Sequence, residues 1–150
     1  MSSKWPFILV LTFALLPGVI WAKGNPINSP QAATRTYAQN YKDMVLAMCI
    51  ANAYKKDTTA SVDAGSSFSA LRDWTYYDME NSPDAIQALV ENYLARDYYN
   101  PLVESEVKGV KFDFLKCLDL YHSKELNAQV KRFVLKPNRS YRQDNPPHKH

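Results

Sequence analysis

The clearest helical pattern in the chain is SPDAIQALVENYL, residues 82–94. It opens with the signals of a helix start: Ser82 can act as the cap, Pro83 suits the first turn, and Asp84 places a negative charge at the positive end of the helix dipole. Apolar residues then recur at three- and four-residue steps, which is the periodicity of a helix with one buried face. The stretch therefore predicts a helix packed against other helices, and this helix has to end before Pro101. The apolar positions are Ile86, Leu89, Val90, Tyr93 and Leu94.

Two further helical patterns precede this stretch. The first begins at a threonine cap, either Thr34 or Thr36, and should end near Tyr54. The second begins at one of the polar residues 57–59 and is weakened by the Gly-Ser-Ser sequence at residues 65–67. The apolar positions of the first are Tyr37, Tyr41, Met44, Val45, Met48 and Ala51, and those of the second are Val62, Phe68, Leu71 and Trp74.

Two more helical patterns follow it, and no segment alternates in the manner of a strand. Phe112, Phe114, Leu115, Leu118 and Tyr121 mark the fourth helix, and the last begins at Ser123 with Leu126, Val130 and Phe133. The prediction is an all-α fold, a compact bundle of four to five helices over residues 23–136. Residues 96–111 form a connection that is long for packed helices, and part of it could be a helical turn. Long connections in compact domains are often functional.

The N-terminal segment, residues 1–22, is typical of a secretory signal peptide. Lys4 supplies the positive charge, residues 7–16 form the apolar region, and cleavage is expected near Ala22. The alternative is an uncleaved membrane anchor, but the apolar run is short for a spanning helix and Pro17 interrupts it. The mature chain should therefore start at Lys23 without a stable membrane anchor.

Charge is unevenly distributed along the chain. Residues 23–130 contain 11 basic and 14 acidic residues, whereas residues 131–150 contain six basic residues and one acidic residue. This pattern indicates a mildly acidic body and a basic C-terminal end. Residues 137–150 are rich in Pro, Asn and Arg and predict a flexible basic tail. Nucleic acid is not an expected partner, because the folded part lacks a basic stripe.

Cys49 and Cys117 are the two cysteines of the chain. An exported protein meets an oxidising compartment, which favours a disulfide between them. Such a bridge would tie the first predicted helix to the fourth, and the chain-entropy model gives it about 4 kcal/mol of stabilisation. The alternative is two separate buried thiols.

Candidate catalytic groups are few. Cys117 and His122 are five residues apart, so they do not share a helix face as a nucleophile and its base would. The acidic pairs within residues 78–80 and 104–106 could act as glycosidase carboxylates, but such pairs are more commonly solvated. Histidines are too few and too scattered for a zinc site. We therefore expect a non-enzymatic protein with no metal and no cofactor.

Tyrosine is the residue type that stands out. All ten tyrosines follow the predicted signal peptide, and two adjacent pairs occur, Tyr76-Tyr77 and Tyr98-Tyr99. Neighbouring helical positions cannot both face one core, so at least one tyrosine of each pair should be exposed. Exposed aromatic residues beside acids are typical of protein interfaces. The alternative is that these tyrosines pack between helices and leave only their hydroxyls at the surface.

Three segments resemble a known family. They are YAQNYKDMVLAMCIA at residues 37–51, DAGSS and ALRDWTYYDME at residues 63–67 and 70–80, and FDFLKCLDLYHS at residues 112–123. Together they are similar to the immunity proteins against the fourth class of type VI secretion amidase effectors. The similarity extends over about residues 37–133, and the predicted signal peptide and the cysteine pair agree with it.

The resemblance implies a helical homodimer in the periplasm of a Gram-negative bacterium. Its partner would be a type VI amidase, a papain-like cysteine hydrolase that cuts the peptide stem of peptidoglycan and is delivered by a rival or sister cell. The immunity protein inserts a protruding segment into the catalytic groove of this amidase. Such an inhibitor needs no catalytic residue of its own.

The candidate for this segment is the connection from Tyr98 to Gly109, because it combines aromatic anchors, a proline and two acids that could meet basic groups around the groove. The predicted contact residues here are Tyr98, Tyr99, Asn100, Glu104, Ser105 and Glu106. A second group of candidates is Tyr77, Asp78 and Glu80, together with Tyr76. The runner-up interpretation is another periplasmic binding module, such as a lysozyme inhibitor or an envelope adaptor.

Overall fold

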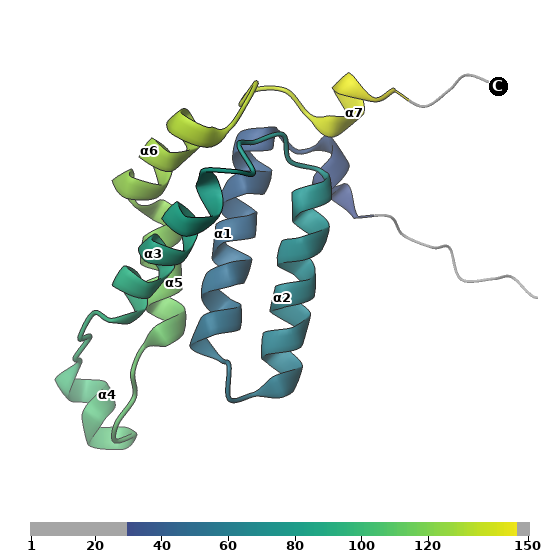
Figure 1. Ribbon diagram of the computed structural model, residues 1–150. Coiled ribbons are helices and arrows are strands. Elements are labelled where there is room, and N and C mark those ends of the chain that lie inside the picture. Colours follow the sequence, from purple (N-terminus) through teal and green to yellow (C-terminus); the bar gives the residue numbers. More distant parts are fainter. Residues whose placement is uncertain (1–29, 147–150) are drawn as a thin grey trace, which may run out of the picture.

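A computed structural model describes residues 30–146 of the chain (Figure 1). Seven α-helices and one short 3-10 helix occur in this range, and the range contains no β-strand, so the predicted all-α fold is confirmed. The five predicted helices are present, and the short helices α4 and α7 are added to them. The elements are η1 (Gln31–Thr34), α1 (Tyr37–Ala53), α2 (Thr58–Asp73), α3 (Ser82–Leu94), α4 (Pro101–Glu106), α5 (Asp113–His122), α6 (Lys124–Phe133) and α7 (Tyr141–Asp144).

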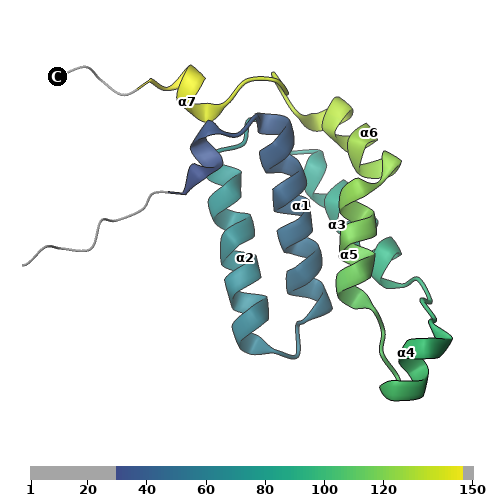
Figure 2. The ribbon, with the colours of Figure 1, turned by 180° about the vertical axis from the view of Figure 1, so that it is seen from behind.

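Helix α1 is the central element of the bundle. Its start is held by a capping box, in which the Thr36 hydroxyl accepts from the Gln39 amide and the Gln39 side chain accepts from the Thr36 amide. Helix α2 packs on one side of α1, and α3, α5 and α6 pack on the other side (Figures 1 and 2). Of the two threonines that could begin this helix, Thr36 is therefore the cap.

The core lies between α1 and the layer of α3, α5 and α6. Its fully buried apolar side chains each stabilise the fold by about 1.5–3 kcal/mol relative to exposure. They come from one face of each helix, as the three- and four-residue spacing predicts. They include Tyr41, Met44, Val45, Ile86, Val90, Leu120 and Leu126. Helix α2 contributes less, because Ala64 is its one buried residue.

The predicted disulfide between Cys49 and Cys117 is confirmed. The bond joins α1 to α5 across 68 residues of chain, and both cysteines are fully buried. It therefore links the central helix covalently to the helix that follows the long connection.

Helix α3 begins at Ser82 as predicted, but Ser82 does not cap it. The Ser82 hydroxyl instead pairs with the Tyr41 hydroxyl at 2.7 Å in the centre of the bundle. The turn before the helix is held by Asp78, whose carboxylate accepts from the amides of Glu80 and Asn81. The buried serine is thus a core contact, which a local sequence pattern cannot reveal.

The C-terminal segment requires a correction, because residues 137–146 are folded against α1 and do not form a flexible tail. The amides of Tyr37 and Ala38 donate to the carbonyl oxygens of Arg139 and Pro137. Amides in the first turn of a helix have no partner within the helix, so an adjoining segment that accepts from them is stabilised. This pairing is non-local, and the polar composition of the segment does not indicate it.

The predicted signal peptide and its cleavage near Ala22 lie outside the described residues, as do the last four residues of the chain. Over residues 30–146, none of the helices has both the length and the apolar character required to cross a bilayer.

Candidate functional site

The connection between α3 and α5 extends away from the bundle. Residues 97–112, here called the protrusion, leave the end of α3, form α4 and return to α5 (Figures 1 and 2). None of the six residues of α4 is buried. The long connection that the sequence predicts is thus a folded protruding element with a helical turn at its tip.

Local interactions define the shape of the protrusion. The Asn100 side chain accepts from the amides of Leu102 and Val103 at 3.0 and 3.4 Å, so it caps α4, and Pro101 occupies the first helical position. The Glu104 carboxylate accepts from the Gly109 amide at 3.2 Å. Gly109 has a φ of 74°, a left-handed conformation that favours glycine and reverses the chain toward α5.

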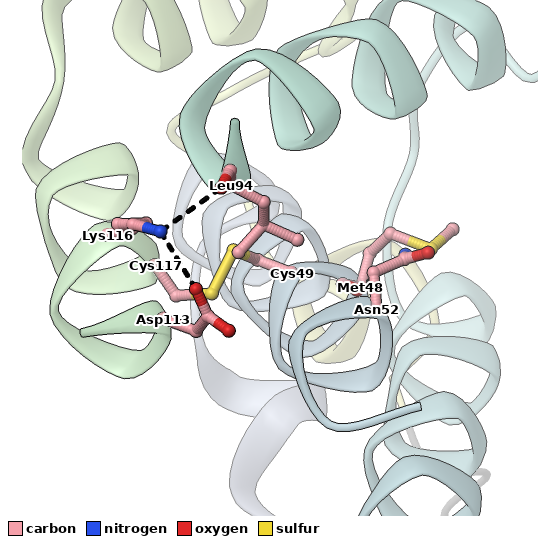
Figure 3. Close-up of a disulfide and its surroundings, with 7 residues drawn as sticks. All are labelled: Met48, Cys49, Asn52, Leu94, Asp113, Lys116 and Cys117. Atoms are coloured by element: carbon pink, nitrogen blue, oxygen red, sulfur yellow. Dashed lines mark hydrogen bonds and ion pairs between the residues drawn. A yellow bond between two sulfur atoms is a disulfide. The ribbon is translucent and has the colours of Figure 1, made fainter. Parts of the chain in front are cut away.

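The base of the protrusion is held by a buried lysine. The Lys116 ammonium donates to the carbonyl oxygen of Leu94 at 3.2 Å and pairs with the Asp113 carboxylate at 2.9 Å (Figure 3). Leu94 ends α3 and Asp113 begins α5, so one side chain ties both ends of the protrusion together. The next residue, Cys117, is bonded to Cys49 of α1. The protrusion therefore stands on a base that is covalently joined to the central helix.

Three large apolar side chains of the protrusion face solvent. Leu102 is 79% exposed, Tyr99 is 72% exposed and Val107 is 58% exposed. Exposed apolar side chains on a projecting element are candidates for contact with another molecule. Sequence reasoning missed Leu102 and Val107. The available signal was their position in a connection, outside any helical stripe that could bury them.

The six predicted contact residues of this segment have different structural roles. Tyr99, Asn100, Ser105 and Glu106 are exposed. The Tyr98 hydroxyl donates to the Asp119 carboxylate, a hydrogen bond that raises the pKa of Tyr98. Tyr98 is hydrogen-bonded to Asp119 of α5, and Glu104 is hydrogen-bonded to the Gly109 amide. These two side chains therefore stabilise the conformation of the protrusion.

The second predicted group lies at the opposite end of the molecule, between α2 and α3 (Figure 1). Tyr77 is only 6% exposed and packs edge-on against Tyr41 at 5.6 Å between ring centroids, so most of its ring is occupied within the bundle. Its neighbour Tyr76 is 49% exposed. The expectation that one tyrosine of each pair is exposed is confirmed.

The acids of this second group have a local structural role. Asp78 accepts hydrogen bonds from the Asn81 side chain and from two backbone amides, and the Asn81 bonds lower the pKa of Asp78. Glu80 is exposed. The two predicted groups therefore do not form one site, and the protrusion alone has the geometry of a projecting contact element.

The protrusion is flanked by a shallow hollow of about 330 Å³, lined by Asp97, Tyr98, Tyr99, Asn100, Phe112 and Leu115. Its lining combines aromatic and apolar side chains with a carboxylate and an amide. Within residues 30–146, no three His, Cys, Asp or Glu side chains converge as metal ligands. The chemistry that this arrangement offers is contact by an apolar, partly acidic surface.

Comparison with known proteins identifies a matching family and two similar structures. A family model described as type VI secretion system (T6SS) amidase immunity protein, Tai4, matches residues 39–130. The matched region extends from α1 into α6 and includes the protrusion and both cysteines. No curated protein sequence matches the chain.

Two solved structures share the fold. One comes from work on new type VI-secreted toxins and self-resistance proteins in Serratia marcescens, with a TM-score of 0.72 and 28% identity over 82% of this chain and 97% of that chain. The other belongs to the effector–immunity system Tae4/Tai4 from Salmonella typhimurium, with a TM-score of 0.60 and 24% identity over 70% of this chain and 96% of that chain. The second similarity concerns the fold alone.

Proposed function

The chain belongs to the family of type VI secretion system amidase immunity proteins, and we propose that it binds and blocks a peptidoglycan amidase of the fourth class, protecting the cell from its own or a sibling's effector. The observation that carries this proposal is the family match over residues 39–130, in a fold whose protrusion offers a ready contact surface.

The protrusion is the inhibitory segment in this proposal. It enters the catalytic groove of the amidase and excludes the peptidoglycan stem peptide. On binding, the side chains of Tyr99, Leu102 and Val107 would leave water and pack against the walls of the groove. Burial of this apolar surface would contribute most of the binding free energy. An ordinary protein interface buries about 800 Å² on each partner, so the surface around the protrusion would also contribute.

The folded base explains how a short segment could bind tightly. The contacts of Lys116 with Leu94 and Asp113, together with the disulfide, already order the protrusion in the free protein. Less conformational entropy is therefore lost on binding. Glu106 and Ser105 are exposed beside the apolar residues and would meet polar groups at the rim of the groove. Inhibition by occupancy requires no catalytic side chain in the inhibitor.

The protein would act in the periplasm as a homodimer, after the signal peptide is removed near Ala22. The disulfide supports this location, because such bonds persist in oxidising compartments. The proposal of a homodimer is supported by two exposed apolar side chains of α5. Phe114 is 50% exposed and Leu115 is 44% exposed. They present apolar surface next to the protrusion, and a neighbouring subunit would cover it.

The test is an inhibition assay with the purified mature protein, residues 23–150, and a fourth-class type VI amidase. Release of peptides from purified peptidoglycan is followed as the inhibitor concentration increases. We expect activity to fall to zero at a stoichiometric ratio. Full activity at excess inhibitor, with no binding by calorimetry to any amidase of that class, would contradict the proposal.

A further inference from the structure

A second concave surface lies next to the protrusion and is lined with lysines. This hollow, of about 550 Å³, is formed by the α1–α2 turn and by the base of the protrusion. Its charged lining residues are Lys55, Lys56, Asp57, Lys111, Asp113 and Lys116. We call it the lysine hollow. Figure 3 shows part of its lining, where Lys116 and Asp113 lie beside the disulfide.

The lining charges do not balance. Lys116 is neutralised by Asp113, and Asp57 caps α2 by accepting from the amides of Thr59 and Ala60. The other three lysines, 55, 56 and 111, form no ion pair with any side chain among residues 30–146. Four lysines against two acids give the lining a net charge of +2. Like charges in a concave surface focus a positive potential and attract an anionic partner.

The lysine hollow is continuous with the proposed inhibitory surface. Lys111 lies on the arm of the protrusion that returns to α5, and Lys55 and Lys56 lie on the α1–α2 turn at the same end of the molecule as α4 (Figures 1 and 2). A partner large enough to receive the protrusion would therefore also cover the lysine hollow. Three unpaired ammonium groups beneath that partner would be costly unless it supplied anions.

We propose that the lysine hollow receives carboxylate side chains from an acidic stretch of the amidase that borders its catalytic groove. This inference rests on the proposed function. It specifies further that the amidase surface facing the lysine hollow is negatively charged. Lysines suit this role because a flexible ammonium group can donate to a carboxylate without a fixed bidentate geometry. Contacts of this kind at an interface rim act mainly on the association rate and on the choice of partner.

The test compares two variants with the same change in net charge. Lys56→Glu/Lys111→Glu reverses two charges of the lysine hollow, and Lys124→Glu/Lys131→Glu reverses two exposed lysines on α6. Association of each full mature chain with the amidase is measured by surface plasmon resonance at low and high salt. We expect the hollow variant to associate about tenfold more slowly than the unmodified protein at low salt. At about 0.5 M salt the two association rates should differ much less. The α6 variant should stay close to the unmodified protein.

The outcomes separate this inference from the proposed function. If the unmodified protein binds the amidase and the two variants associate at the same rate, the lysine hollow has no role in recognition and the inference is overturned. If the unmodified protein does not bind at all, the proposed function itself fails. Inorganic phosphate serves as a probe in a parallel titration. Phosphate that slows association of the unmodified protein, but not of the hollow variant, supports the inference, whereas phosphate binding without that effect indicates an anion site unrelated to the partner.

Discussion

Tyr41 and Ser82 form a hydroxyl pair in the centre of the bundle. Both residues are fully buried, and burial raises the pKa of Tyr41 to about 12. Burial of a hydroxyl is costly unless it is hydrogen-bonded, so the Ser82 hydroxyl depends on Tyr41. The Tyr41 hydroxyl also donates to Gln129 of α6, which links three helices at one point.

This pairing predicts the effect of removing a single oxygen atom. Tyr41→Phe should lower the free energy of unfolding by about 1–3 kcal/mol, because the Ser82 hydroxyl is left buried without its partner. The double variant Tyr41→Phe/Ser82→Ala should recover part of that loss. Urea unfolding followed by circular dichroism measures both values, and strictly additive effects would show that the two hydroxyls are not coupled.

Asp144 holds the C-terminal segment against α1. It pairs with Arg139 and accepts from the Tyr37 hydroxyl. The hydrogen bond from Arg139 is the main reason why the pKa of Asp144 lies below its ordinary value. A lowered pKa in the folded state means that the stabilisation is complete above the ordinary aspartate pKa of about 4 and is lost as the pH falls through the lowered pKa.

Residues 137–146 should therefore detach in acid before the bundle unfolds. We expect their amide protection to be constant from neutral pH down to about pH 4 and to fall below it. Asp144→Asn should cause the same loss at neutral pH. Asp73→Asn changes an exposed carboxylate near the same segment and is the control. Hydrogen exchange measured by mass spectrometry reports the pH dependence and the effect of each variant. Equal protection of residues 137–146 in both variants would contradict the role of Asp144.

At the scale of elements, the protrusion combines an ordered base with an apolar exposed tip. Leu102→Asp should weaken amidase binding, because it places a charge on the most exposed apolar residue of the protrusion, 79% exposed, while aspartate remains acceptable in the first turn of α4. Val62→Asp makes the same change at a residue of α2 that is 66% exposed. Calorimetry with the amidase should show a loss of at least about tenfold in affinity for Leu102→Asp and none for Val62→Asp.

The matched pair also protects this test from a folding artefact. Both variants should unfold at the same denaturant concentration as the unmodified protein, since neither residue is buried. If Leu102→Asp binds as tightly as Val62→Asp, the inhibitory segment lies outside the protrusion.

The disulfide connects the order of the protrusion to the stability of the bundle. Cys49→Ala/Cys117→Ala should lower the free energy of unfolding by about 4 kcal/mol, as expected for a bond that closes a long loop. Loss of protection from hydrogen exchange should be greatest in residues 97–116, because the start of α5 loses its tie to α1. An equal loss of protection in α2 would show that the bond stabilises the fold as a whole without a specific effect on the protrusion.

At the scale of the whole molecule, the two ends differ. One end carries α4 and the α1–α2 turn, with its exposed apolar and lysine side chains, and the other is closed by the C-terminal segment over the start of α1. A second copy that covers Phe114 and Leu115 would lie next to the first end. Light scattering of the mature chain should thus give twice the mass of one subunit. A single-subunit mass at micromolar concentration, unchanged in Phe114→Ser, would remove the dimer from the proposal.

The five longer helices, the start of α3 and the cysteine pair could be predicted from the amino-acid sequence. The helices depend on neighbours within one or two turns, so the spacing of apolar residues is sufficient to predict them. The disulfide could be predicted because the two cysteines allow a single pairing. The position of the long connection followed as well, because it is bounded by a proline and by the next helical stripe. Its exposed Tyr99 lies where aromatic residues next to acids predicted a contact surface.

Which of those residues face outward depends on the tertiary structure. Tyr76 and Tyr77 are adjacent and chemically identical, and only the packing of α1 and the pairing with Val134 place one in solvent and the other in the core. Similarly, the folded C-terminal segment and the lysine hollow join parts of the chain that are many residues apart. The free energy of such contacts depends on distances across the fold, and a pattern read along the chain carries no information about those distances.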